Sequence, residues 1–311
     1  MLSTHNLLTI DNLSTGDIDA ILSTAKSFEE INNRAIKKLP TLRGRTIVNL
    51  FLEPSTRTRM SFEIAAKRLG ADAINMTGSA SSTVKGESLQ DTAQTLNAMS
   101  CDLVVVRHKY AGAPHILSQN MESHIVNGGD GIHQHPTQTL LDLYTLKNEL
   151  GDIKGKTIGI VGDIVHSRVA GSLAPALKKL GAEVIFVAPP TFLPSRPDLL
   201  GARVCNSLDE CIADLDVLYL LRIQKERADG SGIPSGREYA SRYGLDARRA
   251  ALLSEHAIIM HPGPMNRGVE IAGDVVSDSR VKVLNQVSAG VAVRMALMYL
   301  MLGGEDSGIT A

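Results

Sequence analysis

The sequence predicts an α/β protein with two domains, each built on a parallel β-sheet. Short apolar runs alternate with helical patterns over almost the whole length, which is typical of βαβ units. A chain of 311 residues usually forms more than one domain. Residues 151–156 are rich in glycine and lysine and lie between a helical pattern and the next apolar run. This composition favours a domain boundary there. We therefore expect domains at 1–150 and 151–285, with a last helical segment, 286–311, after them.

Eight apolar runs and six helical patterns make up this alternation. The expected strands are 45–51, 72–77, 102–107, 124–127, 157–162, 183–188, 215–221 and 256–261. The expected helices lie near 17–33, 57–70, 87–100, 136–150, 167–181 and 286–302. Ligands of parallel α/β sheets bind at the carboxyl ends of the strands, so polar residues at those ends are the candidates for a site.

The most informative candidates follow the first strand. Ser55, Thr56, Arg57, Thr58 and Arg59 stand where this strand ends and a helix begins. Free N–H groups and the helix dipole favour an anion at such a position, and hydroxyls and a planar guanidinium suit phosphate oxygens. A simple helix cap with solvated arginines is the alternative. The sequence has no G-x-x-x-x-G-K-[ST] motif, which disfavours nucleotide hydrolysis.

A loop and a strand that follow this motif in the sequence each contain one candidate cationic side chain. Ser81 and Lys85 lie in a small, hydroxyl-rich loop that leads into a helix through the capping box beginning at Ser88. This loop is either part of a site or an ordinary surface loop. Arg107 ends an apolar strand, where it is either a surface charge or a ligand contact.

The segment before residue 136 contains two histidines, His133 and His135. Their spacing could serve a metal, but no third ligand has suitable spacing. Pro136 suits the first position of a helix, which places His135 just before the helix and Gln138 on its first turn. A neutral histidine that polarises a carbonyl near a helix N-terminus is therefore the favoured interpretation.

In the second domain, polar residues again follow strands. Arg168 follows the run at 157–162, while Arg222 and Gln224 follow the run at 215–221. The last strand leads into a turn with Gly263 and Pro264. Proline cannot donate a hydrogen bond and glycine can adopt a positive φ, so this turn presents carbonyl oxygens that suit a ligand –NH₂ group.

Composition excludes several other classes. The net charge is −1 and tryptophan is absent, which disfavours nucleic-acid binding. Three cysteines without a C-x-x-C disfavour a disulfide framework and a zinc site, and they favour a reduced, cytoplasmic location. We see no signal peptide and no apolar run of about 20 residues, so no membrane contact is expected. Without a nucleophile elbow, paired acid and base carboxylates or a metal cluster, catalysis would depend on positioning and electrostatics.

The Ser-Thr-Arg-Thr-Arg motif at 55–59 and the His-Pro-Thr-Gln motif at 135–138 resemble those of the aspartate/ornithine carbamoyltransferase family. The resemblance covers about residues 7–303. It implies two doubly wound parallel-sheet domains with the active site in the cleft between them: a carbamoyl-phosphate-binding domain, to which the last helix returns, and an amino-acid-binding domain. It also implies a homotrimer whose active sites are shared between subunits.

The resemblance implies a role for each matched residue. Catalytic roles fall to Thr58, Arg107 and His135. Carbamoyl-phosphate binding falls to Ser55, Thr56, Arg57, Thr58, Arg107, His135, Gln138, Gly263 and Pro264. Binding of the amino acid falls to Lys85, Arg168, Arg222 and Gln224. Ser81 and Lys85 form the loop that a neighbouring subunit supplies. No cofactor and no metal are expected.

Two features bear on the amino acid and on partners. The ornithine branch usually has cysteine at the positions of Thr137 and Pro262, and Arg168 and Arg222 suit a dicarboxylate, so aspartate is the expected acceptor. Transfer to another amino acid such as ornithine, or an inactive homologue serving as a structural subunit, is the alternative. The turn at 263–270 departs from relatives that bind regulatory chains, which leaves open a bare trimer, regulatory chains or a dihydroorotase-like partner.

Overall fold

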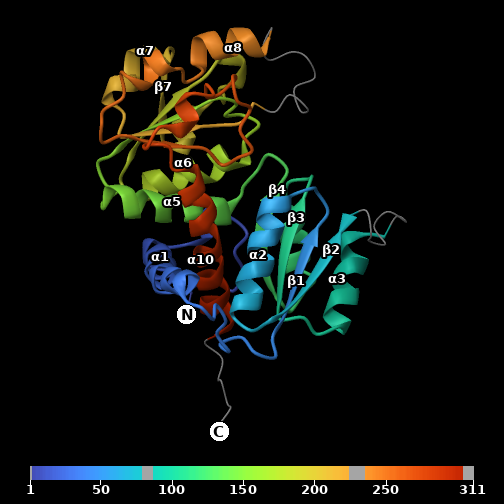
Figure 1. Ribbon diagram of the computed structural model, residues 1–311. Helices are drawn as coiled ribbons and strands as arrows, with labels where there is room; N and C mark the ends of the chain where they lie inside the picture. Colours follow the sequence, from blue (N-terminus) through green and yellow to red (C-terminus); the bar gives the residue numbers. More distant parts are fainter. Residues whose placement is uncertain (1, 79–86, 224–234, 304–311) are drawn as a thin grey trace. The chain divides into compact units, whose positions relative to one another are not determined.

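The computed structural model describes residues 2–78, 87–223 and 235–303. The chain divides into two compact units (Figure 1). Unit 1 consists of Met1–Tyr144 and Ser288–Ala311, and unit 2 consists of Thr145–Val287. Each unit contains one parallel sheet with flanking helices, so the predicted α/β class with two parallel sheets is confirmed.

The sheet of unit 1 has the strand order β2-β1-β3-β4, and all neighbouring pairs are parallel. Its strands are β1 (Thr46–Phe51), β2 (Asp72–Thr77), β3 (Leu103–His108) and β4 (His124–Asp130). The strand order changes direction between β1 and β3, so the loops after these two strands lead away to opposite sides. Such a switch point is where open α/β sheets bind ligands.

Six α-helices contribute residues to unit 1 in the described part of the chain. They are α1 (Thr15–Glu29), α2 (Thr56–Arg68), α3 (Leu89–Ala98), α4 (Ala113–Ser118), the start of α5 (Pro136–Leu150) and most of α10 (Val283–Leu302). The predicted capping box before α3 is confirmed, since Ser88 Oγ accepts from Asp91 N at 3.1 Å. Phe28 of α1 packs edge-on against Tyr299 of α10, with ring centroids 5.7 Å apart. The last helix thus belongs to the core of the first unit.

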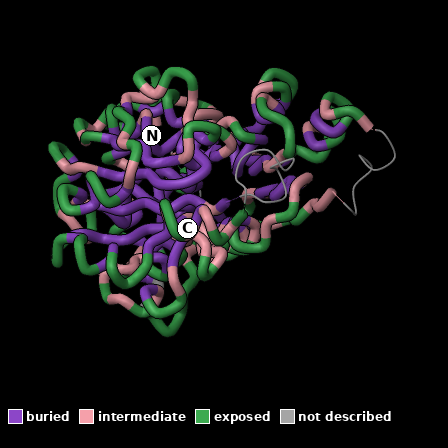
Figure 2. Tube along the Cα trace, turned by 90° about the horizontal axis from the view of Figure 1, so that it is seen from above, coloured by how far each residue is buried: buried purple, intermediate pink, exposed green. Residues whose placement is uncertain are grey.

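The sheet of unit 2 has the order β7-β6-β5-β8-β9, again fully parallel, with its switch point between β5 and β8. Its strands are β5 (Thr157–Val161), β6 (Glu183–Val187), β7 (Ala202–Cys205), β8 (Val217–Leu220) and β9 (Ile258–Met260). Its helices include α6 (Arg168–Lys179), α7 (Leu208–Cys211), α8 (Gly236–Tyr243) and α9 (Ala247–Ala250). The central strands are buried, whereas the edge strands β2 and β7 are largely exposed. Figure 2 shows buried residues toward the interior and exposed residues toward the outside.

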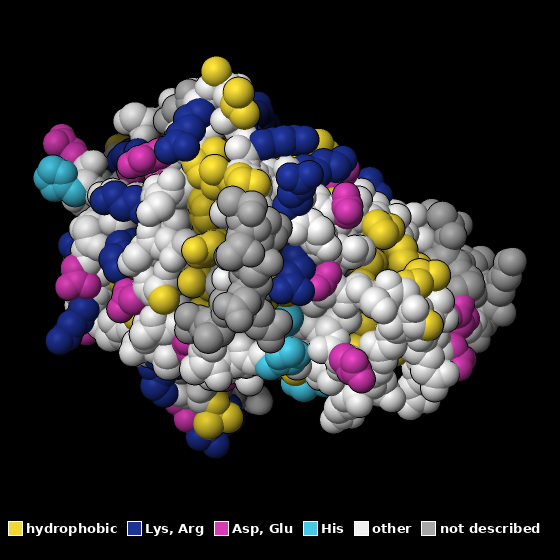
Figure 3. Space-filling view, turned by 90° about the horizontal axis from the view of Figure 1, so that it is seen from below, with side chains coloured by type: hydrophobic (Ala, Val, Ile, Leu, Met, Phe, Trp, Pro, Cys, Tyr) yellow, Lys and Arg dark blue, Asp and Glu magenta, His cyan; other side chains and the backbone are white. Residues whose placement is uncertain are grey.

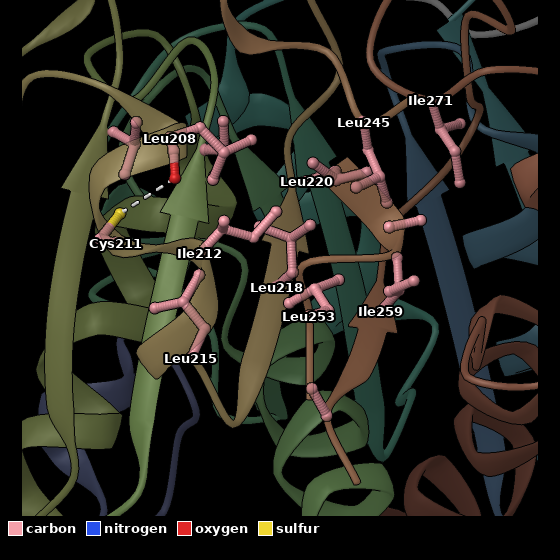
Figure 4. Close-up of a cluster of buried hydrophobic side chains, with 14 of the residues drawn as sticks. Leu208, Cys211, Ile212, Leu215, Leu218, Leu220, Leu245, Leu253, Ile259 and Ile271 are labelled. Carbon is pink, nitrogen blue, oxygen red and sulfur yellow. Dashed lines mark hydrogen bonds between the residues drawn. The ribbon is translucent and has the colours of Figure 1, made fainter. Parts of the chain in front are cut away.

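A large apolar cluster lies under one face of this second sheet (Figure 4). Leu208 and Ile212, from α7 and the turn after it, point toward Leu218 and Leu220 of β8, and Ile259 of β9 lies next to them. All five side chains are essentially buried. Their burial holds β8 and β9 in place, and these strands lead into two of the predicted site segments.

Helix α10 is long and apolar enough, by length and composition, to be a candidate membrane span. The sequence predicted no such span, because no apolar run approaches about 20 residues. In the structure 56% of its most hydrophobic window is buried. Packing in the core therefore accounts for its apolar character.

The surface of the described residues mixes both signs of charge. On the face drawn in Figure 3, lysine and arginine side chains are interspersed with acidic ones, and histidine appears both near the centre and at the left edge. His5 and His124 form a ring contact in unit 1, with centroids 4.0 Å apart. This mixture agrees with the net charge of −1.

Candidate functional site

The turn from β1 to α2 is a candidate anion-binding position. Ser55 is the residue before α2, its backbone is extended, and its hydroxyl makes no capping hydrogen bond. The first turn of α2 contains no acidic residue. The hydroxyl and the first N–H groups of the helix can therefore serve a bound anion, which the helix dipole also favours.

A hollow of about 410 Å³ adjoins this turn. Glu53, Ser55, Thr56 and Arg59 line it from the turn and the start of α2, and Thr77 lines it from the end of β2. Thr58 is buried on the first turn of α2, and Arg57 is exposed. The hollow lies beside the carboxyl ends of the neighbouring strands β1 and β2.

Arg107 lies across the switch point from this turn. It is paired with Phe51 in the β1–β3 ladder, and its backbone carbonyl accepts from Leu52 N at 2.8 Å. Its side chain is mostly buried: Nη1 donates to Gly128 O at 3.3 Å, and Nε lies 3.4 Å from Glu53 Oε2. The guanidinium is thus held between the exits of β1 and β4. Glu53 lies two residues after the end of β1, but the sequence alone does not single it out.

His135 directly precedes α5 in the segment that follows β4. Its carbonyl accepts from Gln138 N at 3.0 Å and from Thr139 N at 3.2 Å, and Pro136 is the first helical residue, as predicted. The imidazole is 4% exposed, and its Nδ1 lies 3.5 Å from Thr137 Oγ1. A histidine held in this way at a helix N-terminus can act as a hydrogen-bond donor to a substrate oxygen.

Gln138 is oriented by a buried acid one helical turn later. Its Nε2 donates to Asp142 Oδ1 at 3.0 Å, and Asp142 is fully buried. Because the amide nitrogen faces Asp142, the amide oxygen is the atom that Gln138 can offer to a ligand –NH₂ group. The sequence reasoning did not single out Asp142, although a spacing of four residues on a helix is enough to relate it to Gln138.

The corresponding residues of unit 2 lie at the other switch point. Arg168 is the first residue of α6 and is mostly buried, and Ser167 before it caps the helix by accepting from Ala170 N at 3.2 Å. Arg222 directly follows Leu221 at the exit of β8. The strands before these arginines, β5 and β8, are neighbours in the sheet.

A buried acid links the segment after β8 to the turn after β9. Glu270 accepts from Ile223 N at 2.8 Å and from Asn266 N at 2.6 Å, and Asn266 Nδ2 donates to Ile223 O at 3.2 Å. Burial raises the pKa of Glu270, against the effect of these hydrogen bonds. The backbone next to Arg222 is thereby fixed relative to the turn that holds Gly263 and Pro264.

In that turn Gly263 has the positive φ that the sequence allowed for, while the cis peptide bond was not predicted. Gly263 has a φ of +66°, the Gly263–Pro264 peptide bond is cis, and Gly263 N donates to His261 Nδ1 at 2.8 Å. With this N–H occupied and no N–H on Pro264, the turn can offer carbonyl oxygens to a ligand.

Within unit 1 the structure brings the residues after β1, β3 and β4 to one sheet edge, and within unit 2 it does the same for those after β5, β8 and β9. Ser81, Lys85 and Gln224 lie outside the described residues. Among the described residues, no group of three His, Cys, Asp or Glu side chains could hold a metal ion. The roles of the individual site residues and the functional domain boundaries stay predictions.

Fold and site together define an α/β protein with two parallel sheets, whose first unit presents hydroxyls, helix N–H groups and a mostly buried arginine at a switch point. Residues 5–148 match the family model described as the aspartate/ornithine carbamoyltransferase carbamoyl-phosphate-binding domain, and residues 154–301 match that of the Asp/Orn-binding domain. The chain belongs to the aspartate/ornithine carbamoyltransferase family.

Relatives named aspartate carbamoyltransferase catalytic subunit share about half of the residues. The one from Acidothermus cellulolyticus is 54% identical over 97% of this chain and 94% of its own length. The one from Nocardioides sp. is 53% identical over 98% of this chain and 97% of its own.

Solved structures agree in fold. Aspartate transcarbamoylase from Trypanosoma cruzi, in complex with carbamoyl phosphate and aspartate, has a TM-score of 0.85 and 32% identity, covering 94% of this chain and 95% of that chain. The catalytic subunit of the M. jannaschii enzyme has a TM-score of 0.84 and 38% identity, covering 98% of this chain and all (100%) of that chain.

Proposed function

We propose that this chain catalyses the transfer of a carbamoyl group from carbamoyl phosphate to L-aspartate, giving N-carbamoyl-L-aspartate and phosphate. The reaction is the committed step of pyrimidine biosynthesis. The observation that carries the proposal is the switch point of unit 1, where the uncapped N-terminus of α2 and its hydroxyls follow β1 and Arg107 lies near the end of the neighbouring strand β3. The family and the ligands named for the T. cruzi structures support it.

In the proposed mechanism, the phosphate group binds to the N–H groups and hydroxyls at the start of α2 and to Arg57. Thr58, Arg107 and His135 donate hydrogen bonds to the carbamoyl oxygen. Gln138, with the carbonyls of Gly263 and Pro264, accepts from the carbamoyl –NH₂ group.

Arg168, Arg222 and Gln224 bind aspartate, and its neutral α-amine attacks the carbamoyl carbon. Negative charge then develops on the carbamoyl oxygen, where the three donors stabilise it. The C–N bond forms, the C–O bond to phosphate breaks, and the departing phosphate takes the proton of the amine. No enzyme-bound acyl group forms.

The test of this function is the choice of amino acid. Purified protein should carbamoylate L-aspartate with a kcat/KM at least about 100-fold above that for L-ornithine. A charge-assisted hydrogen bond contributes roughly 1.5–3 kcal/mol, and each ~1.4 kcal/mol is a factor of ten in kcat/KM. Similar turnover of the two amino acids would refute the assignment. No turnover of either would favour an inactive homologue with a structural role.

The assembly is proposed to be a cytoplasmic homotrimer with shared active sites, in which Ser81 and Lys85 act in the neighbour's site. Arg57→Ala and Lys85→Ala should each be nearly inactive. Dissociated and reassociated together, the two variants should regain about a quarter of wild-type activity, because random assembly in a closed ring joins an intact Arg57 to an intact Lys85 at about that share of interfaces.

Wild-type protein taken through the same cycle is the control. A mixture that stays as inactive as its parents would refute shared sites. The native mass of the complex from cell extract would distinguish a bare trimer from an assembly with regulatory chains or a dihydroorotase-like partner.

A further inference from the structure

Helix α10 carries one charged side chain into the core of unit 1. Arg294 is 4% exposed. Its Nη1 donates to Ser61 Oγ of α2 at 2.8 Å and to Gly290 O of its own helix at 3.2 Å. Its Cζ lies 4.8 Å from the ring centroid of Phe62. A guanidinium that α10 supplies thus contacts two consecutive residues of the helix whose N-terminus forms the proposed phosphate site.

Helix α10 also lies against α5 at this point, since a Cβ placed on Gly290 would lie 3.3 Å from Leu141 Cδ2 of α5. Burial lowers the pKa of Arg294 to about 10, and attraction to the buried carboxylate of Asp142 opposes this shift. Asp142 in turn accepts the hydrogen bond from Gln138 at 3.0 Å. Contacts and charge therefore connect Arg294 with α2 on one side and, through Asp142, with the first turn of α5 on the other.

The absence of a side chain at Gly290 leaves room for the guanidinium of Arg294. A Cβ placed on Gly290 would lie 2.6 Å from Arg294 Nη1 and 3.5 Å from Ser61 Oγ. A side chain at position 290 would displace the guanidinium from Ser61. The close approach of α10 to α2 is thus built around the arginine.

A buried charge contributes little to stability, because removing it from water costs free energy that its contacts must offset. What buried charged groups can supply is a defined arrangement of the elements they join. We propose that Arg294 and Asp142 are positioning residues, which hold the N-termini of α2 and α5 in the relative arrangement that one carbamoyl phosphate molecule requires. The inference rests on the proposed function, since it concerns the same half-site.

The experiment uses the double variant Arg294→Met/Asp142→Asn in the full-length protein. It removes both charges, so neither is left buried alone, and the asparagine oxygen can still accept from Gln138. A misplacement of about 1 Å can cost about 100-fold in rate. We expect carbamoyl-phosphate affinity by calorimetry without aspartate to fall at least about tenfold, and kcat to fall by a similar factor. The aspartate KM and the urea midpoint should stay close to wild type.

Two single variants complete the test. Arg294→Lys keeps the charge but loses the fork, and should give carbamoyl-phosphate affinity between those of wild type and the double variant. Met295→Leu, a fully buried neighbour on the same helix, controls for general packing and should behave as wild type.

A double variant with wild-type carbamoyl-phosphate affinity and kcat would overturn the proposal, as would a fall in activity that only follows a lower urea midpoint. The proposed function has its own outcomes. Wild-type protein that binds carbamoyl phosphate without turning over refutes the function and leaves the positioning test intact. Wild-type protein that does not bind it refutes both.

Discussion

Arg249 provides a test of how unit 2 is held together. It lies on α9 with its side chain 3% exposed, and its Nε and Nη2 donate to the two carboxylate oxygens of Asp209 at 2.9 and 3.1 Å. The same guanidinium donates to the carbonyls of Ser241, Arg242 and Gly244, at the end of α8. One side chain therefore caps α8 and ties it to α7. Arg249→Met removes these contacts while keeping an apolar chain of similar length.

The expected loss can be worked out from exposure. Breaking a fully buried ion pair costs about 3–5 kcal/mol. Asp209 is 39% exposed, so water solvates part of the charge that is left behind, and the lower end of that range applies. We expect Arg249→Met to lower the free energy of unfolding by about 3 kcal/mol, which is about 1 M in the urea midpoint if the slope is near 3 kcal/mol per M.

Arg248→Met is the matched control. Arg248 also contacts Asp209, with Nη2 2.9 Å from Oδ1, but its side chain is 59% exposed. An exposed pair contributes at most about 1 kcal/mol, so the midpoint should hardly move. Far-UV circular dichroism in urea suits a chain without tryptophan. Equal shifts for the two variants, or none for Arg249→Met, would refute the reasoning.

Two further predictions concern catalysis and acid stability. His135→Ala should lower kcat by roughly 10²–10³, as for loss of one oxyanion donor, with little change in carbamoyl-phosphate affinity. His133→Ala is the control, because the His133 side chain is partly exposed. An unchanged kcat for His135→Ala would exclude a catalytic role for His135. Burial alone would raise the pKa of Asp17, but hydrogen bonds from Ser14 and Ser3 outweigh it and lower that pKa far below its usual range. A lowered carboxyl pKa stabilises the fold above the unfolded-state pKa of about 3.9, and this contribution disappears as the pH falls further. Asp17→Asn should therefore have a lower urea midpoint than wild type at pH 7, with a gap that narrows toward pH 3; a gap that widens in acid would contradict the assignment.

The sequence predicts the buried strands well and the exposed elements poorly. β1 and β5 are hydrophobic runs whose residues are buried on both faces of the sheet, so composition alone identifies them. β7 was missed because this edge strand is only four residues long and largely exposed, with Arg203 within it. α8 was missed for a similar reason, since only Tyr239 of its eight residues is buried.

For the candidate site, the sequence locates the strand ends but not what supports them. Arg107 could be recognised because it ends an apolar run, yet its partner Glu53 depends on the β1–β3 register, which no local pattern contains. The contact between Arg294 and Ser61 joins residues 233 positions apart. The available signal was one charged residue in a mostly apolar helix, and only the fold shows which helix it contacts.

The arrangement of unit 1 along the chain has a consequence for its biosynthesis. Residues up to Tyr144 leave the ribosome first, but α10, whose residues from Ser288 onward complete the unit, follows only after the whole of unit 2. At about 5–20 residues per second, this delay amounts to roughly 7–30 s. The nascent first unit must therefore wait with the apolar surface meant for α10 uncovered, and Ser61 cannot meet Arg294 until synthesis is nearly complete. Unit 2 is continuous in sequence and can complete its core before α10 is synthesised. Unit 1 therefore begins to be synthesised first but completes its fold last.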